Sequence, residues 1–343
     1  MKYLFFALLL IGAMNRAHAS ETMEIGVQTH RWHRGLAPHT VERMIREAGA
    51  TSWRDDVYWS AVERKKGIYD VPADLDAVIR AADDAPAQGL CPLIIVDYGN
   101  PLYETGGLVT TPEARKGFAA YARWLAGRLK GKACYYEIWN EWNIGAGSTA
   151  QPRSVGSVGD YAALVRAAAA AIRAADPRAK VIAGGATDND TAWFEAFGRS
   201  GVLDVIDGVS IHPYNYGRPL FAHTPEAAIG WVQDIQARLS RQRGRPVTMY
   251  VTEIGWPAHD AGYAPELVAD YLERFMRLAR RDPHIGGVWW YDLVNDGDSA
   301  SDPEHRFGLF DRQYRPLPAL RALRACCSRP QPPPVQRDER QVR

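Results

Sequence analysis

Residues 135–139, Tyr-Tyr-Glu-Ile-Trp, form a short β-rich run. A segment with apolar residues at helical spacing follows at Asp160–Ala175, and a second β-rich run follows that segment at Val181–Gly184. A strand, a helix and a strand in this order indicate two parallel strands joined by a crossover helix. The fold class therefore depends on how often this unit recurs along the chain.

The strand-and-helix unit recurs throughout residues 22–327, and no linker rich in Pro, Gly or Ser interrupts it. Eight units predict a single (β/α)8 TIM barrel, an α/β fold in which parallel strands close into a ring. An open doubly wound sheet is the alternative; it favours a Gly-x-Gly-x-x-Gly turn after the first strand, which residues 28–33 lack. The expected strands are Glu24–Thr29, Thr51–Arg54, Leu90–Val96, Tyr135–Trp139, Val181–Gly184, Gly208–Ile211, Val247–Thr252 and Gly287–Trp290. The expected helices are Thr40–Ala48, Ala73–Ala82, Pro112–Leu129, Asp160–Ala175, Thr191–Phe197, Pro225–Arg241 and Pro265–Arg281.

The composition is that of a soluble globular protein with a large core. The 343 residues are 46% hydrophobic and 24% charged, which excludes a wholly disordered chain. The 41 Lys and Arg residues nearly balance the 40 Asp and Glu residues, and no basic stripe occurs, so nucleic acid is not an expected partner.

Both ends of the chain are expected to lie outside the barrel. Lys2, the apolar run 3–14 and the sequence Ala-His-Ala at 17–19 predict a cleaved signal peptide over residues 1–19, and hence a periplasmic or secreted protein. The alternative is an uncleaved membrane anchor, but the apolar run is shorter than the roughly 20 residues of a spanning helix. The barrel domain then covers residues 20–327. The tail 328–343, rich in Pro and Arg, is expected to be disordered.

The four cysteines leave two interpretations open. Cys91 and Cys134 each begin an expected strand, and the two strands would be neighbours in the barrel. A disulfide between them is conceivable, and two small buried thiols are the alternative. The spacing of Cys326 and Cys327 matches no zinc site, so no metal is expected there.

Acidic residues stand at the ends of two expected strands. Glu141 follows the fourth strand, and Glu253 directly follows the seventh. In a barrel, side chains at the carboxyl ends of the strands converge on one mouth, so these two carboxylates are expected to face each other. Two facing carboxylates are the minimal equipment for cleaving a glycosidic bond, because one protonates the leaving oxygen while the other attacks or stabilises the sugar cation.

Aromatic residues are abundant near the same strand ends. The chain has 11 Trp and 16 Tyr, whose flat apolar faces suit the stacking of sugar rings. About half of those near strand ends are expected to belong to the core and half to a cleft. The residues concerned are Trp32, Trp53, Trp59, Tyr98, Trp139, Trp142, Tyr214, Tyr216, Trp256, Trp289, Trp290 and Tyr291.

The acidic strand ends resemble a known group of enzymes. Asn140-Glu141 and Glu253 are similar to the acid/base and nucleophile signatures of retaining glycoside hydrolases of clan A, and the resemblance covers the whole barrel. The stretches 98–103 and 304–310 are most similar to family 39-like bacterial enzymes, including some that cut exopolysaccharides, and family 5 is among the nearest competitors. The sequence around Glu253 departs from the family 39 xylosidase pattern, which argues against a xyloside substrate. Further positions that match the clan's site are Arg54, His212, Tyr214 and Trp290.

The resemblance implies a double displacement. Glu253 would attack the anomeric carbon in its ionised form, and Glu141 would first protonate the departing oxygen and later take a proton from water. Arg54 would keep Glu253 ionised. Asn140 would bind the sugar 2-hydroxyl, and Tyr214 would hold Glu253 through its phenol.

Four aromatic and histidine residues complete the expected site. His212 would bind a substrate hydroxyl or a carboxylate, with a purely structural histidine as the alternative. Trp290 would form the floor under the reacting sugar, although Trp289 and Trp290 cannot both face inward, and barrel core is the alternative. Trp256 is a weaker candidate for a neighbouring subsite. His30, after the first strand, is as consistent with structure as with binding.

The expected function is hydrolysis of O-glycosidic bonds in a polysaccharide or oligosaccharide. The resemblance favours a bacterial exopolysaccharide. Long loops after the third, fourth and eighth strands favour an extended cleft and an endo mode, and a pocket closed by the same loops is the alternative. No cofactor and no metal is required, and no membrane insertion is expected after signal cleavage. The alternatives are a non-catalytic carbohydrate-binding barrel and a transglycosidase that uses the same intermediate.

Overall fold

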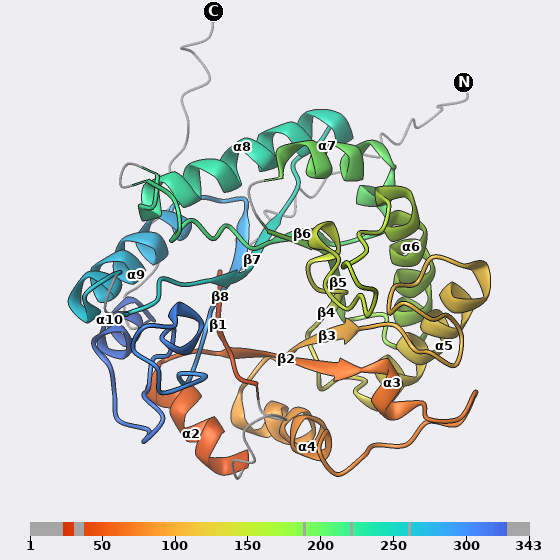
Figure 1. Cartoon of the computed structure of the whole chain (residues 1–343), viewed down its shortest axis with the longest axis horizontal. Helices are drawn as coiled ribbons and strands as arrows, with labels where there is room; N and C mark the ends of the chain where they lie inside the picture. Colours follow the sequence, from red (N-terminus) through yellow and green to blue (C-terminus); the bar gives the residue numbers. More distant parts are fainter. Residues whose placement is uncertain (1–22, 31–37, 188–189, 220–221, 260–261, 328–343) are drawn as a thin grey trace, which may run out of the picture.

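In the computed structural model of the protein, eight parallel strands close into a barrel in sequential order, with β8 paired to β1. The structure describes residues 23–30, 38–187, 190–219, 222–259 and 262–327. Viewed nearly down the barrel, the strands occupy the centre and the helices surround them (Figure 1). The strands are β1 (Glu24–Gln28), β2 (Ser52–Tyr58), β3 (Leu93–Asp97), β4 (Tyr135–Ile138), β5 (Lys180–Ala186), β6 (Gly208–Ile211), β7 (Met249–Ile254) and β8 (Ile285–Trp290). The predicted TIM barrel is confirmed.

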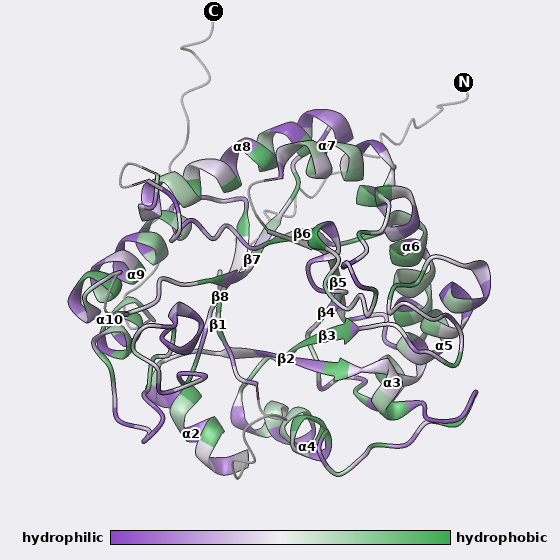
Figure 2. Cartoon of the chain, viewed as in Figure 1, coloured by the Kyte–Doolittle hydropathy of each residue, from purple (hydrophilic) through white to green (hydrophobic). Residues whose placement is uncertain are grey.

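The seven expected helices follow the strands, and the described part of the chain has two more. The helices are α2 (Pro38–Glu47), α3 (Trp59–Val62), α4 (Asp76–Asp84), α5 (Pro112–Arg128), α6 (Val158–Ala175), α7 (Thr191–Arg199), α8 (Pro225–Arg243), α9 (Pro265–Ala279) and α10 (Pro318–Cys327). The two that were not predicted are the short α3, directly after β2, and α10 after the eighth strand, which lies against α9. In Figure 2 the larger helices each carry both hydrophilic and hydrophobic residues, as is typical of helices that pack one face against a sheet.

Side-chain caps explain why several helices begin where they do. The Thr111 hydroxyl accepts a hydrogen bond from the Ala114 N–H at 3.2 Å at the start of α5, and the Ser157 hydroxyl accepts one from Asp160 N–H at 3.0 Å at the start of α6. Such caps satisfy N–H groups that have no partner within the helix. These two helices therefore have a start signal that can be read from the sequence.

The barrel interior is a small core of its own. Six buried side chains fill it, and the much larger core lies between the strands and the helices. Trp289 of β8 turns into this interior, and its ring occupies the space beside Gly26 of β1, where an added Cβ would lie 2.1 Å from the ring. The six residues are Leu93, Ile95, Tyr135, Ile182, Tyr250 and Trp289.

Cys91 and Cys134 form a disulfide, with their Cα atoms 5.4 Å apart. They precede β3 and β4, at the opposite end of the barrel from the carboxyl ends of the strands. Of the two interpretations that the sequence left open, the structure therefore has the bridge.

Several expectations concern residues beyond those described. The signal peptide 1–19, the tail 328–343 and Trp32 lie outside the described residues. Among the helices of the described part, none is long and apolar enough to cross a membrane.

Candidate active site

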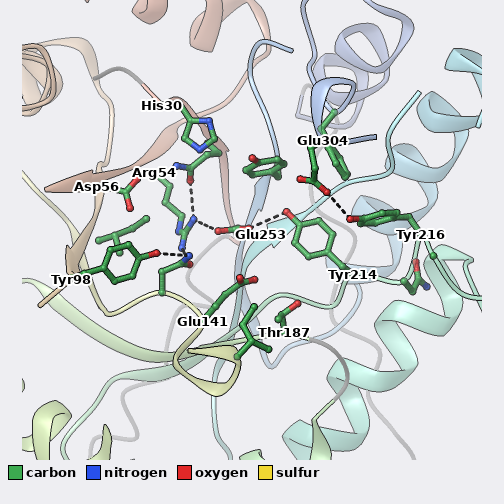
Figure 3. A pocket seen from close by; sticks show the side chains of 18 of the residues that line it. His30, Arg54, Asp56, Tyr98, Glu141, Thr187, Tyr214, Tyr216, Glu253 and Glu304 are labelled. Atoms are coloured by element: carbon green, nitrogen blue, oxygen red, sulfur yellow. Dashed lines mark hydrogen bonds and ion pairs between the residues drawn. The ribbon is translucent and has the colours of Figure 1, made fainter. Parts of the chain in front are cut away.

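A cavity of about 660 Å³, called here the central cavity, opens at the carboxyl ends of the strands. Its lining comes from around the whole barrel, and Figure 3 shows the side chains turned toward a common centre. Residues that line it include His30, Arg54, Asp56, Tyr98, Asn140, Glu141, Tyr214, Glu253 and Tyr291.

Glu253 lies within β7 and not after it, because the strand continues to Ile254, which pairs with Trp290 of β8. Its Oε1 accepts a hydrogen bond from Arg54 at 2.6 Å, and its Oε2 accepts one from the Tyr214 hydroxyl at 3.0 Å. Burial alone would raise the pKa of Glu253, but the positive charges of His212 and Arg54 and these hydrogen bonds lower it below its ordinary value. The site therefore holds Glu253 as an ionised carboxylate.

Arg54 is the buried cation of the site, with 1% of its surface exposed. Besides Glu253, its guanidinium donates to Glu137 at 2.7 Å, to Gln28 at 2.9 Å and to Asn140 Oδ1 at 2.9 Å. The planar guanidinium has donors enough for all four partners in fixed directions. Arg54 thus fixes the positions of the Glu253 carboxylate and the Asn140 amide, which both line the cavity.

Glu141 has a left-handed backbone conformation, with φ of +49°. Such a conformation in a residue other than Gly costs roughly 1–3 kcal/mol and persists only where the surroundings impose it. The N–H of Glu141 donates to the Gly185 carbonyl at 3.0 Å, and the indole of Trp139 donates to the Ala146 carbonyl at 3.1 Å across the same turn. The turn directs the Glu141 side chain into the cavity, where Figure 3 shows it facing Glu253.

A chain of hydrogen bonds runs behind the two carboxylates. The Thr252 hydroxyl donates to Glu137 Oε1 at 2.8 Å, so its oxygen is left to accept from His212 Nε2, 3.0 Å away. With a proton on Nε2, the other nitrogen of His212, Nδ1, lies 3.0 Å from Glu141 Oε1. A single proton between Nδ1 and Glu141 Oε1 then gives both groups a hydrogen bond.

His212 also lies beside the second carboxylate, with Nδ1 3.8 Å from Glu253 Oε2. Burial would lower the pKa of His212, but the charges of Glu253 and Glu141 and the hydrogen bond to Glu141 outweigh burial and raise it. Five side chains therefore form a closed circuit, called here the charge ring: Arg54, Glu137, Thr252, His212 and Glu253.

The two cavity carboxylates lie close together. Oxygen atoms of Glu141 and Glu253 and a nitrogen of His212 all lie within 4.8 Å of one another. Carboxyl groups about 5–5.5 Å apart are typical of retaining glycosidases, whereas about 6.5–9.5 Å leaves room for the water of an inverting one. Oxygens within 4.8 Å of each other are compatible with the shorter, retaining spacing and leave less room than an inverting enzyme needs.

His30 lines the cavity from the end of β1 and is held by acidic residues. Its Nδ1 lies 3.4 Å from Asp296 and 3.8 Å from Asp292. Burial opposes the charge, but these carboxylates raise the pKa of His30 to about 9. The three residues, like Glu141, His212 and Glu253, are spaced closely enough to ligate a cation. A protonated His30 instead makes the first group an ion-paired cluster, because a metal ligand needs the neutral imidazole.

Comparison with known proteins assigns the family. The sequence model described as Cellulase (glycosyl hydrolase family 5) matches residues 16–292. This chain belongs to glycosyl hydrolase family 5. No curated protein matches the chain.

Solved structures similar to this family 5 chain are glycoside hydrolases too. A family 39 enzyme from the gut symbiont Bacteroides cellulosilyticus has 27% identity and a TM-score of 0.72 over 90% of this chain, which spans 64% of that enzyme. A variant of a family 5 subfamily 18 enzyme from Streptomyces cattleya, in complex with Manβ1-4GlcNAc, has 17% identity and a TM-score of 0.70 over 91% of this chain and 83% of its own. A family 39 enzyme from Xanthomonas axonopodis pv. citri has 18% identity and a TM-score of 0.64, with coverages of 88% and 65%. The resemblance to clan A is confirmed.

The family 5 barrel brings most of the predicted site residues together, but not all. Trp290 is 1% exposed and donates from its indole to the Phe307 carbonyl at 3.2 Å, within the core. Trp256 is fully buried beside it. Neither residue lines the cavity; Tyr291, the next residue after Trp290, lines it instead. Those that meet at the cavity or behind it are His30, Arg54, Asn140, Glu141, His212, Tyr214 and Glu253.

Two acidic residues at the cavity, Asp56 and Asp97, were not predicted from the sequence. Asp56, in β2, lines the cavity, and Asp97, at the end of β3, is fully buried next to it. Burial and the proximity of acidic neighbours raise the pKa of both carboxyls. Acidic residues inside a run of strand character were the signal available, because an acid survives there only where the fold uses it.

Proposed function

We propose that this family 5 barrel is a retaining glycoside hydrolase acting on a polysaccharide or oligosaccharide. The observation that carries the proposal is the placement of Glu141 and Glu253 within 4.8 Å of each other with different partners. Glu253 accepts from a cation and a phenol, as a nucleophilic carboxylate requires, whereas Glu141 faces a histidine with which it can share a proton.

The first step forms a glycosyl-enzyme. A Glu253 oxygen attacks the anomeric carbon, the bond from that carbon to the leaving oxygen breaks, and the proton on Glu141 passes to that oxygen. In the second step a water molecule gives a proton to Glu141 while its oxygen attacks the anomeric carbon, and the bond to Glu253 breaks. The configuration is retained because both displacements invert it.

Other lining residues would bind the reacting sugar. Asn140 and Glu253 both accept hydrogen bonds from Arg54, which holds Asn140 near the nucleophile. From there the amide of Asn140 can reach the 2-hydroxyl of the sugar, and this contact strengthens in the transition state. The ring of Tyr291 takes the role of sugar platform that the sequence suggested for Trp290. Asp56 supplies an acceptor for a further hydroxyl.

The long loops that follow β3, β4 and β8 support an endo mode of attack on a polymer. We further propose that the protein is exported. The apolar run 3–14 with Ala-His-Ala at 17–19 supports this, and so does the Cys91–Cys134 disulfide, since disulfides persist mainly in oxidising compartments.

The test compares the wild type with Glu141→Gln and Glu253→Gln on 4-nitrophenyl β-glycosides and on a panel of bacterial exopolysaccharides and plant β-glycans. Each variant is expected to lose about 10³-fold or more in kcat/KM on polysaccharide, measured as reducing ends released. With a dinitrophenyl leaving group, Glu141→Gln should keep the first step and lose the fall in rate at high pH, because no proton is then needed. Glu304→Gln, a carboxylate of the same cavity bonded to Tyr216, is the matched control and should keep most of the activity.

Two results would overturn the proposal. One is a product that first appears, by NMR, with the inverted anomeric configuration. The other is an unchanged kcat/KM on polysaccharide in either Gln variant. Transfer of the glycosyl group to an added sugar in preference to water would instead identify a transglycosidase.

A further inference from the structure

A second cavity adjoins the central one and has no part in the mechanism above. This side cavity, of about 540 Å³, lies between the loops that follow β2, β3 and β4 and includes Ser60, Gly107 and Thr149 in its lining. The two cavities have Tyr58 and Tyr98 in common. The rings of these tyrosines stack with centroids 5.8 Å apart, so one aromatic wall faces both spaces.

The wall of the side cavity is built by tight contacts and is not a loose gap between loops. The Gly99 N–H donates to the Gly107 carbonyl at 3.1 Å, and the Thr149 N–H donates to the Gly106 carbonyl at 2.9 Å, which ties the β4 loop to the β3 loop. Gly107 has φ of +84°, and a Cβ on it would lie 2.0 Å from the Gly147 carbonyl oxygen. Only glycine fits there, so the backbone itself forms the wall.

The chemistry of the side cavity suits a neutral sugar residue. The hydroxyls of Thr105 and Thr149 line it and make no hydrogen bond to any residue in the described part of the chain. Hydroxyls, backbone groups and an aromatic wall are the partners that a sugar ring uses, and the lining includes one acidic residue, Glu104, and no cation. Glu104 already accepts hydrogen bonds from Thr110 and Thr111.

The position of the side cavity tells which part of the reacting sugar it adjoins. Asn140, proposed above to bind the 2-hydroxyl, donates from Nδ2 to the Tyr98 hydroxyl at 3.3 Å. C2 of the reacting sugar therefore lies toward Tyr98, which Figure 3 shows at one side of the central cavity. C3 follows C2 around the ring and lies farther from the two carboxylates, so its oxygen points at the wall shared with the side cavity.

We propose that the side cavity binds a sugar residue linked to O3 of the reacting sugar, so that the substrate is a 3-linked or 3-branched glycan. This inference rests on the proposed hydrolase function and deepens it. A chain linked only through O4, on the ring carbon opposite C1, would leave the side cavity unused.

The linkage of the new reducing ends tests this directly. The polysaccharide that the wild type depolymerises is digested, the new ends are reduced with borodeuteride, and methylation analysis locates their substituents. Ends substituted at O3 are expected, since each new reducing end is the sugar that occupied the central cavity. Ends with a free O3 would overturn the inference while leaving hydrolysis established. Release of no ends from any polymer would overturn the hydrolase function and the inference together.

A pair of variants gives a second test. Ser60→Trp places a large ring in the side cavity from an exposed position of α3 that does not line the central cavity. Its kcat/KM on the polysaccharide is expected to fall at least tenfold more than its kcat/KM on a 4-nitrophenyl glycoside, which has no residue to place there. Ser154→Trp, an exposed change in the β4 loop that touches neither cavity, is the matched control. An equal effect of Ser60→Trp on both substrates would contradict the assignment.

Discussion

Glu253 can act as a nucleophile only while it is ionised, and its partners determine the pH range in which this holds. Arg54 and Tyr214 both donate to it, and both favour the charged carboxylate. Its lowered pKa means that activity should fall on the acid side below the ordinary value of 4.5 for a glutamate. The partners of one carboxylate thus determine the acid limit of the enzyme.

Tyr214→Phe should move that acid limit. Removing one donor to a charged acceptor costs the anion about 1.5 kcal/mol, so the pKa of Glu253 rises and the acid limb of kcat/KM shifts up by about one pH unit. Measurement of kcat/KM against pH with an activated aryl glycoside checks this. Tyr216→Phe removes a phenol that bonds Glu304 and should leave the limb in place. An acid limb unchanged in Tyr214→Phe would show that this tyrosine does not set the charge state of Glu253.

His30 should make the stability of the fold depend on pH. Its pKa is about 9 in the folded protein against 6.5 for a free histidine, so its ion pairs stabilise the fold fully below pH 6.5 and are lost as the pH rises through 9. The contribution is at most about 3 kcal/mol. His30→Asn, which tolerates the φ of +43° at this position, should be less stable than the wild type at pH 6 and nearly equal at pH 10. Urea unfolding at the two pH values measures the difference, and a constant gap would contradict a role for the ion pairs.

Adjacent aromatic residues mark a limit of sequence analysis at this scale. Trp290 ends β8 and Tyr291 follows it directly, and the first faces the core while the second faces the cavity. Which one faces the cavity depends on the register of β8 against β1 and β7, and no local pattern contains that information. Glu141 and Glu253 were predictable because a carboxylate at the end of an apolar strand is costly to bury unless it faces a polar site.

Among the elements, β2 shows why strand ends are difficult to predict. It was expected to end at Arg54 but continues to Tyr58, through two buried acids that a hydropathy pattern assigns to a loop. Asp55 accepts a hydrogen bond from the Thr29 hydroxyl at 2.6 Å, a partner 26 residues away. Burial of such groups depends on partners from other strands, which the local sequence does not reveal. The apolar β6, by contrast, has the predicted bounds Gly208–Ile211.

The disulfide joins the beginnings of two neighbouring elements and should contribute stability without touching the site. Its cysteines are 43 residues apart, and the chain-entropy estimate for a loop of that length is about 4 kcal/mol. The Cys91→Ser, Cys134→Ser double variant should therefore unfold at lower urea concentration while keeping its kcat/KM. Reductant should destabilise the wild type to the same level and leave the double variant unchanged. A loss of activity below the unfolding range would show that the bridge does affect the cavity.

At the scale of the whole molecule, closure of the barrel depends on a residue without a side chain. The Trp289 ring fills the interior beside Gly26, and its indole donates to the Ser52 hydroxyl at 2.8 Å, which ties β8 to β2 across β1. A methyl group on Gly26 would collide with that ring, so β1 could not stay paired between its neighbours without displacement of the tryptophan.

Gly26→Ala should destabilise the whole fold by about 1–3 kcal/mol, as expected for overpacking. Gly230→Ala is the matched control, because that glycine is exposed in α8 with open space around it, and alanine should stabilise the helix by about 1 kcal/mol. Denaturant unfolding of the two variants should therefore give changes of opposite sign. A neutral Gly26→Ala would show that the barrel closes without the space that this glycine leaves.

The charge ring also limits how this protein can change through evolution. Each of its five side chains bonds or pairs with others of the ring on other strands. Replacing one of them alone therefore leaves a buried charge or hydrogen-bond donor without its partner, and a tolerated change would need two substitutions at once. The exposed side chains of the side cavity, Ser60, Thr105 and Thr149, lie outside this circuit and can vary one residue at a time. Descendants of this barrel should therefore diverge in the glycans they accept long before they diverge in the reaction they perform.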